Sequence, residues 1–382
     1  CCGAGVRSVI HIVKITYLSS ARIPDEWGHF IQIMKMCEAF ANAGNEVTLL
    51  VPSRAKTPAT DPFLYVGAEP VFKVVKVPCI DVAAGSSSTL TYWLRTISFL
   101  ITSRIYLLLH SHDLVYTREL PGTFLLKNFV YEVHDITPRM RARGAELLKR
   151  ARALVVLTSY IREELTAAGF PDNKILVSPD AVDLRDFAHP ESKDAARGRL
   201  GLPKDKVLAL YIGRTDAWKG MEALYGAAAV LPSHVQIVVI GAEAGEIEGL
   251  RRENPNVIFV SYRPYKELAD NQAAADMLLL PNTAKNALSA KYTSPLKLFT
   301  YLASGKPIVA SDIPSIREIL DERTAVLVEP DNAQALAEGI LRVAEDNSMQ
   351  RALGVCARER AQTFTWENRA RTILKYVASR SA

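Results

Sequence analysis

Residues 294–311 read SPLKLFTYLASGKPIVAS, a stretch that joins the start of a helix to a buried strand. Serine is favoured at helix N-caps and proline in the first helical position, so Ser294 and Pro295 predict a helix that begins at residue 295. The apolar run PIVAS at 307–311 follows and predicts a β-strand. A helix that leads directly into a buried strand is typical of an α/β fold.

The same alternation of β-branched apolar runs with amphipathic stretches extends over almost the whole chain, as in parallel strands joined by crossover helices. The predicted strands are 8–17, 46–51, 71–77, 114–117, 129–133 and 153–157 in a first series, and 207–213, 235–241, 257–260, 277–280, 307–311 and 325–329 in a second. We therefore predict two Rossmann-like, doubly wound parallel sheets that face a central cleft. Ligands should bind beyond the carboxyl ends of the strands.

Composition limits the classes of protein to which the chain can belong. With 382 residues, 49% of them hydrophobic and 23% charged, the chain fits a globular protein of two domains. The net charge of +5 is too small to indicate a nucleic acid partner. The five cysteines are scattered and odd in number, which favours a reducing, cytoplasmic compartment over a disulfide scaffold, and no signal peptide is expected.

Two stretches suggest contact with a membrane surface. The run YWLRTISFLITSRIYLLL at 92–109 contains Arg95 and Arg104, so it predicts a packed or surface-lying helix and not a spanning one. The run RMRARGAELLKRAR at 139–152 carries six cations and one acid, which suits anionic lipid headgroups, although a solvated helix face explains it equally well. An anionic membrane on the inner face of the cell is therefore a candidate partner.

The stretch GRTDAWKG at 213–220 places two cations five residues apart, directly after a predicted strand. Arg214 and Lys219 could converge on one anion at the start of the next helix, where free N–H groups favour negative charge. A diphosphate suits this pair, because arginine can hold two oxygens while lysine supplies a compact charge. Two solvated surface cations are the alternative.

Lys297 lies in the first turn of the helix predicted from residue 295. The helix dipole opposes a positive charge there unless an anion lies beside it, so Lys297 indicates a bound phosphate. A surface lysine on a capped helix is the alternative.

Polar residues also follow two neighbouring strands of the first series. His134 follows the strand 129–133, where it could contact a sugar hydroxyl or move a proton, or else cap the next loop together with Asp135. Arg118 and Glu119 follow the strand 114–117 and could contact the same ligand, or form a local ion pair.

The sequence gives little support to a metal or a cofactor. His110 and His112 have no third ligand at a useful spacing, and no Asp-x-Asp pair is present to hold a divalent cation against a diphosphate. Neither a Walker sequence nor G-x-G-x-x-G occurs, which argues against an NTPase or a dinucleotide enzyme. We expect neither a metal nor a cofactor.

Taken together, these motifs resemble the retaining glycosyltransferases of family four, which have the GT-B fold and include glycogen-synthase-like and mannosyltransferase-like enzymes. The resemblance covers nearly the whole chain. It is carried by IQIMKMCEAFANAGNEVTLLVP (31–52), YEVHD (131–135), ILVSPDAVDL (175–184), YIGRTDAWKG (211–220) and SPLKLFTYLASGKPIVASDIPSIREIL (294–320). It implies an acceptor domain at 1–180, closed by a tail helix at 364–382, and a donor domain at 186–362.

The resemblance further implies that a nucleotide-sugar donor binds mainly to the second domain. The residues that it assigns to donor contacts are Gly28, Arg214, Lys219, Tyr262, Arg263, Ser294, Leu296, Lys297 and Thr300. Arg214 and Lys219 match the cations on the diphosphate, and Gly28 matches a glycine whose amide reaches the donor from the first domain. Tyr262 and Arg263 lie where the nucleobase is contacted. His134 matches a histidine beside the transferred sugar.

Three features depart from the family pattern. Two glutamates separated by seven residues are common in the donor site, and here those positions are Tyr292 and Thr300. Loss of the first is common in relatives that read SPLKLF. The second glutamate usually accepts hydrogen bonds from the donor ribose, and the shorter, neutral Thr300 would weaken donor binding by on the order of 1–3 kcal/mol. The first loop reads SARIPDEWGH (20–29) in place of a double-glycine turn.

The implied activity is transfer of a hexosyl unit from a UDP- or GDP-sugar to a hydroxyl of a glycan, a lipid-linked sugar or a small molecule. Retention of anomeric configuration and independence of metal are implied as well. Two alternatives remain. A nucleotide-sugar 2-epimerase would need acid and base carboxylates of its own in the cleft, and the family-four segments argue against it. A catalytically silent nucleotide-sugar binder has its best support in Thr300.

Overall fold

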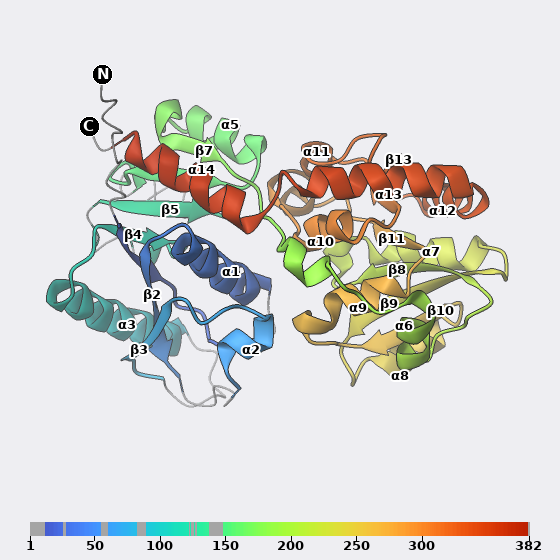
Figure 1. Cartoon of the computed structure of the whole chain (residues 1–382), viewed down its shortest axis with the longest axis horizontal. Helices are drawn as coiled ribbons and strands as arrows, with labels where there is room; N and C mark the ends of the chain where they lie inside the picture. Colours follow the sequence, from blue (N-terminus) through green and yellow to red (C-terminus); the bar gives the residue numbers. More distant parts are fainter. Residues whose placement is uncertain are drawn as a thin grey trace, which may run out of the picture.

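A computed structural model of the chain describes residues 12–25, 28–54, 60–81, 89–121, 123, 126, 128–136 and 148–380. These residues form two α/β domains that lie side by side, each built on one parallel sheet (Figure 1). The predicted fold class, two doubly wound parallel-sheet domains, is confirmed. Most of the basic run at 139–152 lies outside the described residues.

The sheet of the first domain has seven parallel strands in the order β3-β2-β1-β4-β5-β6-β7. The strands are β1 (Lys14–Leu18), β2 (Glu46–Ser53), β3 (Lys73–Pro78), β4 (Leu114–Thr117), β5 (Phe129–Val133), β6 (Ala153–Val156) and β7 (Ile175–Val177). The winding direction reverses between β1 and β4, and α/β sheets bind ligands beyond the carboxyl ends of the strands at such a reversal.

The sheet of the second domain has six parallel strands in the order β10-β9-β8-β11-β12-β13, with the reversal between β8 and β11. The strands are β8 (Val207–Ile212), β9 (Val235–Ala242), β10 (Val257–Ser261), β11 (Met277–Leu280), β12 (Ile308–Ser311) and β13 (Val326–Val328). All six coincide with predicted strands to within about two residues. Among the described strands only β7 was not predicted, because a three-residue strand has no detectable periodicity.

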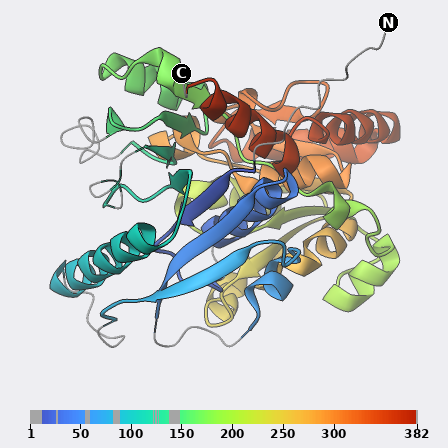
Figure 2. The ribbon, with the colours of Figure 1, turned by 60° about the vertical axis from the view of Figure 1, so that its left-hand side comes forward.

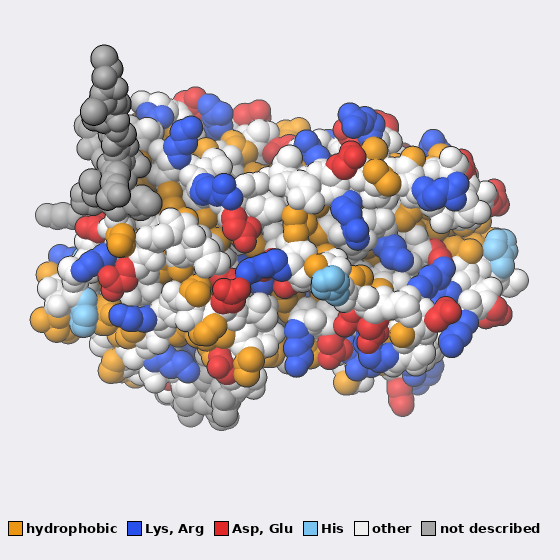
Figure 3. All heavy atoms as spheres, viewed as in Figure 1, with side chains coloured by type: hydrophobic (Ala, Val, Ile, Leu, Met, Phe, Trp, Pro, Cys, Tyr) orange, Lys and Arg blue, Asp and Glu red, His pale blue; other side chains and the backbone are white. Residues whose placement is uncertain are grey.

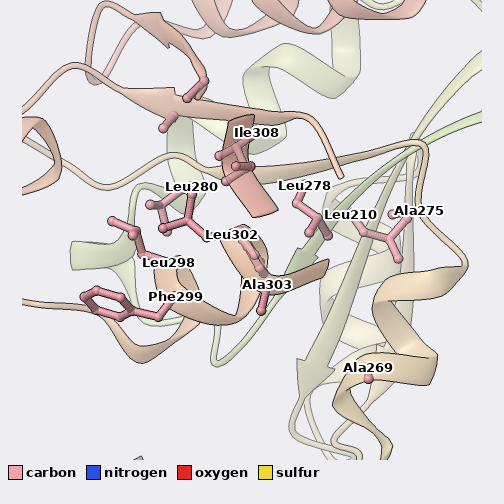
Figure 4. Packing of buried hydrophobic residues seen from close by; sticks show 14 of the residues in the cluster. Leu210, Ala269, Ala275, Leu278, Leu280, Leu298, Phe299, Leu302, Ala303 and Ile308 are labelled. Carbon is pink, nitrogen blue, oxygen red and sulfur yellow. The ribbon is translucent and has the colours of Figure 1, made fainter. Parts of the chain in front are cut away.

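Helices cover both faces of each sheet (Figure 1). In the first domain, one face carries α1 (Gly28–Asn42), α2 (Pro62–Val66) and α14 (Trp366–Ala378), and the other carries α3 (Thr89–Leu109) and α5 (Ser159–Ala167). In the second domain, one face carries α6 (Lys193–Leu200), α9 (Leu268–Ala273), α10 (Leu296–Ser304), α11 (Pro314–Arg317) and α13 (Asn347–Ala361), and the other carries α7 (Met221–Val230), α8 (Ile247–Glu253) and α12 (Ala333–Glu345). Figure 4 shows Leu298 and Leu302 of α10 packed beside Leu280 of β11 in the core of the second domain.

The chain crosses between the domains twice, and the two crossing segments run side by side. The amide of Val182 donates to the carbonyl of Phe364 at 2.9 Å, and the amide of Trp366 donates to the carbonyl of Val182 at 3.3 Å. After the second crossing, α14 packs against α1 with Ile373 and Val377 in the core of the first domain. The C-terminal helix is therefore part of the first domain.

The start of α10 differs from the prediction. The helix begins at Leu296, with Pro295 in the N-cap position and no side chain that caps it. Ser294, the predicted cap, instead accepts a hydrogen bond from the amide of Asp180 at 3.0 Å. The correction has a physical reason, because Ser294 is buried at the domain junction, where its hydroxyl satisfies the backbone of the other segment. The first amides of α10 are left uncapped by a side chain.

Candidate active site

The loop between β8 and α7 carries the two cations that the sequence analysis singled out. Nζ of Lys219 lies 2.8 Å from Oδ2 of Asp216, and Nε of Arg214 lies 3.4 Å from the same oxygen. Nη1 of Arg214 also lies 3.3 Å from Oε1 of Glu243. Burial lowers the pKa of Lys219, although Asp216 opposes this shift. The structure thus brings Arg214 and Lys219 together through Asp216, a carboxylate that the sequence analysis did not identify.

Gly220 fixes the course of this loop. It has a φ of 79°, and a Cβ atom built on it would lie 1.8 Å from the carbonyl oxygen of Pro281. Any other residue would push the loop away from the end of β11. The cations of the β8 loop are therefore held close to the reversal point of the second sheet, where α/β proteins bind ligands.

Lys297 projects from the first turn of α10 toward the same loop. Its Nζ lies 3.8 Å from the ring centroid of Tyr211, and a Cβ atom on Gly213 would lie 2.8 Å from it. The nitrogen is buried and has no hydrogen-bond partner among the described residues. Burial and the nearby Lys219 hold the pKa of Lys297 well below its usual value, while Asp216 acts in the opposite sense. A cation so placed is incompletely neutralised and would gain from an anion.

The N-termini of α1 and α10 meet across the domains. A Cβ atom built on Gly28, the first residue of α1, would lie 3.4 Å from Cδ1 of Leu296, the first residue of α10. The amino ends of helices carry free N–H groups and partial positive charge. Gly28 and Leu296, which the family resemblance places on one donor, are therefore close in space although they belong to different domains.

Thr300 lies in α10 but is only 2% exposed. Its hydroxyl accepts a hydrogen bond from Nε2 of Gln272 at 3.0 Å and donates one to the carbonyl of Lys297 at 2.9 Å. Both bonds lie inside the second domain. The Thr300 hydroxyl is thus bonded to α9 and to its own helix. Its contact with the donor ribose stays a prediction.

His134 follows β5, as predicted, and its environment centres on a buried carboxylate. Nε2 of His134 lies 2.9 Å from Oε1 of Glu132, which is fully buried. The same Oε1 accepts hydrogen bonds from Nε2 of Gln32 at 2.6 Å and from Nη2 of Arg369 at 2.9 Å, and Tyr116 donates to Oε2. Glu132 therefore links α1, β4, β5 and α14 at the base of the site.

Burial and the charges around Glu132 together determine the protonation of His134. Burial alone would raise the pKa of Glu132, but Arg369, the bond from His134 and Arg118 hold it well below its usual range. Burial lowers the pKa of His134 to about 4, and Arg118 adds to this shift, although Glu132 acts against it. Near neutral pH the imidazole is therefore uncharged. Its Nε2–H donates a hydrogen bond to the Glu132 carboxylate, and Nδ1 carries no proton and can accept one.

Arg118 and Glu119 lie near this site but bond to different partners. Nη1 of Arg118 donates to Oε1 of Gln32 at 2.8 Å, and Oε1 of Glu119 accepts from the amide of Ser20 at 3.2 Å. Arg118 thus joins the Gln32–Glu132 network, whereas Glu119 holds the loop that follows β1.

Tyr262 and Arg263 follow β10, which is an edge strand of the second sheet. The hydroxyls of Tyr262 and Tyr65, from different domains, lie 3.0 Å apart. Tyr262 is 36% exposed, and Nε of Arg263 is buried without a hydrogen-bond partner in the described part of the chain. An exposed ring beside an incompletely bonded guanidinium is suited to contact a planar, polar group.

Sequence reasoning missed four residues of the site: Gln32, Glu132, Asp216 and Arg369. Three of them, Gln32, Glu132 and Arg369, are buried polar residues, and buried polar side chains indicate a hydrogen-bond network. Glu132 breaks the apolar run FVYEV and could have been noticed for that reason. Arg369 could not, because it reaches Glu132 across 237 residues of sequence.

The described residues include no group of three histidines, cysteines, aspartates or glutamates that could hold a metal ion. His110 instead stacks on Tyr106, and its Nδ1 lies 2.9 Å from the carbonyl of that residue. In the part of the chain that the structure covers, no helix is both long and apolar enough to cross a bilayer.

Two family profiles match the chain in succession. The profile described as Glycosyltransferase Family 4 matches residues 28–186, and that described as Glycosyl transferases group 1 matches residues 206–346. The D-inositol 3-phosphate glycosyltransferase of Xylanimonas cellulosilytica is 30% identical over 273 residues, which is 66% of this chain and 63% of that relative. The chain thus spans less than two thirds of the length of this curated relative.

Solved structures share the fold over nearly the whole chain. Sucrose-phosphate synthase from Thermosynechococcus elongatus superposes with a TM-score of 0.76 at 21% identity, over 96% of this chain and 98% of that one. HepE from Anabaena, solved in complex with UDP and glucose, gives a TM-score of 0.74 at 17% identity, over 96% of this chain and all of that one. With both halves matched by family profiles on a shared two-domain architecture, the chain belongs to the family-four glycosyltransferases of the GT-B fold.

Proposed function

We propose that the protein transfers a hexosyl unit from a UDP- or GDP-sugar to a hydroxyl acceptor, with retention of anomeric configuration and without a metal. The observation that carries this proposal is the buried ammonium of Lys297, which lacks a hydrogen-bond partner in the described structure and lies beside Lys219. Together with Arg214, these side chains form a cationic site. Asp216 contacts both Arg214 and Lys219, and Glu243 contacts Arg214 as well. A diphosphate suits such a site.

The chemical role of this site would be electrostatic. As the bond between the sugar and the diphosphate breaks, negative charge grows on the leaving phosphate, and fixed cations and helix N-termini stabilise it. Arg214, Lys219, Lys297 and the uncapped amides of α10 would act in this way from the second domain, and Gly28 from the first. The leaving phosphate oxygen would take the acceptor proton.

His134 would contact the transferred sugar as a neutral group. Its low pKa leaves Nδ1 free of a proton at neutral pH, so it can accept a hydrogen bond from a sugar hydroxyl. Glu132 fixes the opposite edge of the ring, as a carboxylate that orients an imidazole does in many sites. Tyr262 and Arg263 would contact the nucleobase, and Arg118 and Glu119 the acceptor.

The donor part of the proposal is tested by calorimetric titration with UDP, GDP and UDP-glucose. Arg214→Ala and Lys219→Ala should each weaken nucleotide binding by about 10–100-fold, the loss expected for one charged contact. Lys204→Ala is a matched control, because Lys204 is exposed and lies at the opposite, amino-terminal edge of β8. Equal binding by both cation variants and the wild type would exclude this donor site.

Turnover is tested by release of UDP or GDP from labelled donors. A transferase releases the nucleotide when a hydroxyl acceptor is added and gives a product with retained configuration, which nuclear magnetic resonance detects at the anomeric carbon. Nucleotide release without acceptor, accompanied by a 2-epimeric sugar, would indicate an epimerase. Tight donor binding with no turnover across a panel of glycan, lipid-linked and small acceptors would indicate a silent binder.

A further inference from the structure

Helix α3 presents an apolar stripe to solvent. Its members recur every three or four residues and are between 40% and 69% exposed: Leu90, Leu94, Ile97, Ile101, Ile105 and Leu108. The buried residues of the same helix, Phe99, Ser103 and Leu107, form a narrower stripe on the opposite side. A surface helix normally has the reverse pattern, with its wider apolar stripe on the core. The outer face of α3 is thus suited to an apolar environment that the described residues do not provide.

This stripe is the main exposed apolar feature of the described structure. Among the sixteen exposed large hydrophobic side chains found there, nine belong to α3. Figure 2 shows α3 at the periphery of the first domain, beside the edge strand β3, and Figure 3 shows hydrophobic side chains at the left-hand end of the molecule, where α3 ends. Contiguous exposed apolar surface of this kind marks an interaction site.

The charged side chains of α3 itself are all positive. The sequence has no acidic residue between Asp81 and Asp113. Arg95 and Arg104 are nine positions apart in α3, two and a half turns, so they lie on opposite sides of the helix and flank the stripe. Arg54 lies near Arg95 and Arg22, because burial and then these two guanidiniums lower the pKa of Arg54, while Asp81 acts in the opposite sense.

The aromatic residues lie at one end of the stripe. Tyr92 and Trp93 are 44% and 41% exposed and lie in the first two turns, where Arg95 is 5.9 Å from the ring centroid of Tyr92. Tyrosine and tryptophan favour the boundary between headgroups and acyl chains, because their rings are both apolar and polar. This combination of an apolar stripe, flanking arginines and aromatic residues at one end is the pattern of a helix that lies in the plane of a membrane.

We propose that α3 docks the protein on an anionic lipid surface, with its apolar stripe buried among the outermost acyl segments and Arg95 and Arg104 on the headgroups. A second copy of the chain fits the stripe less well, because two α3 helices without an acidic residue would bring four arginines together and supply no carboxylate of their own. Anionic headgroups neutralise those arginines. The inference does not depend on the transferase activity, so it can fail while the proposed function stands.

Flotation of the intact chain with vesicles tests this inference. At low salt the protein should float with vesicles of phosphatidylcholine and phosphatidylglycerol, and much less with phosphatidylcholine alone. The variant Ile97→Gln/Ile101→Gln/Ile105→Gln should lower the bound fraction by at least about tenfold, because it removes three side chains from the apolar stripe. The control Val230→Gln/Val355→Gln changes two residues of similar exposure in the second domain and should bind as the wild type does.

Two further measurements distinguish the occupants of the stripe. Brominated acyl chains should quench wild-type tryptophan fluorescence, and this quenching should be reduced in Trp93→Phe. Light scattering without vesicles reports self-association. The inference is overturned if the wild type does not float at low salt, if it floats equally well with both kinds of vesicle, if the triple variant floats undiminished, or if the triple variant abolishes a dimer of the wild type.

Discussion

Lys297 shows how one side chain can be unfavourable for the free protein and useful for binding. Its ammonium is buried against the ring of Tyr211 and close to a second cation, Lys219, and it has no hydrogen bond within the described structure. A buried charge in this situation destabilises the fold, and the ring offsets the loss only in part. A bound phosphate would remove this deficit.

The variant Lys297→Met should therefore separate stability from binding. We expect the free protein to gain about 1–3 kcal/mol of unfolding free energy, because methionine fills the space without a buried charge. The same variant should bind UDP at least about tenfold more weakly. Thermal unfolding and calorimetry measure the two effects, and a loss of stability together with unchanged affinity would contradict the role of Lys297.

The difference in unfolding free energy between Lys297→Met and the wild type should depend on pH. The pKa of Lys297 is lower in the folded chain than its ordinary value of 10.5, so the unfolded chain binds more protons between the two values. The stability contributed by this residue therefore rises with pH across that window. The stability advantage of Lys297→Met should accordingly shrink as the pH is raised toward 10.5.

Thr300 provides a second test of a single side chain. In the structure the Thr300 hydroxyl bonds to Gln272 and to the backbone of α10. Thr300→Val should therefore lower the unfolding free energy by about 1–3 kcal/mol, because the buried amide of Gln272 loses its acceptor. Thr300→Ser keeps the hydroxyl and is the matched control. Nucleotide affinity, measured by calorimetry, should be similar in all three proteins. A loss of affinity in Thr300→Val alone would show that the Thr300 hydroxyl contacts the donor.

Helix α14 shows how a distant element can complete the site. Arg369 is buried, donates to Glu132 and also bonds the carbonyls of Pro179 and Ser178 at the domain crossing. The helix reaches this position because its own apolar face, with Ile373 and Val377, packs on α1. Packing of α14 and orientation of His134 are thereby linked through Glu132.

Removal of the Arg369 guanidinium should disturb both the packing of α14 and the orientation of His134. Arg369→Met leaves the Glu132 carboxylate buried without its main cation, so we expect a loss of about 3–5 kcal/mol at neutral pH. The pKa of Glu132 lies below its usual range, so its contribution is present above about pH 4.5 and is lost as the pH falls through the folded value. The deficit of Arg369→Met should therefore narrow in acid. Denaturant unfolding at neutral and acid pH measures this dependence.

Two further variants make the Arg369 experiment specific. Adding Glu132→Gln to Arg369→Met removes the unpaired charge and should restore part of the stability. Arg371→Met alters an exposed arginine two residues along the same helix and should have little effect. A double variant no more stable than Arg369→Met would show that Arg369 acts through packing and not through Glu132.

The two domains contact each other in several places besides the chain crossings. Glu318 of the second domain accepts from the amide of Ser159 at 3.0 Å and from its hydroxyl at 2.7 Å, at the first turn of α5. The hydroxyl of Tyr292 donates to Glu164 at 2.7 Å. Tyr292, at a position where the family resemblance suggests a glutamate, here joins the domains. Such polar contacts hold the two halves of the site in register.

Glu318→Ala should loosen this junction. The carboxylate caps the N-terminus of α5, so its loss should weaken the first helical turn by about 0.5–2 kcal/mol. Hydrogen exchange at the amides of that turn should become faster. Glu322→Ala, which removes only an exposed pair with Arg317, is the control. Unchanged exchange in Glu318→Ala would show that the two domains are held elsewhere.

Residues close together in the chain already indicated the fold and part of the site. The strands β8 and β11, the loop from Gly213 to Gly220 and the helix after Pro295 each have a local pattern, because hydrophobic period, turn residues and helix starts depend on neighbours in sequence. Arg214, Lys219 and Lys297 could be proposed as a phosphate site for the same reason.

Packing settled which way several of these side chains point. Ser294 turns to the backbone of Asp180 and not to its own helix, Thr300 turns to Gln272, and Arg369 reaches Glu132. Each of these contacts joins segments far apart in the chain, and a buried polar group takes whichever partner the packed elements bring within reach. Sequence neighbours carry no information about that partner, which is why SPLKLFTYLASGKPIVAS revealed a helix, a strand and a cation but not the surroundings of Ser294 and Thr300.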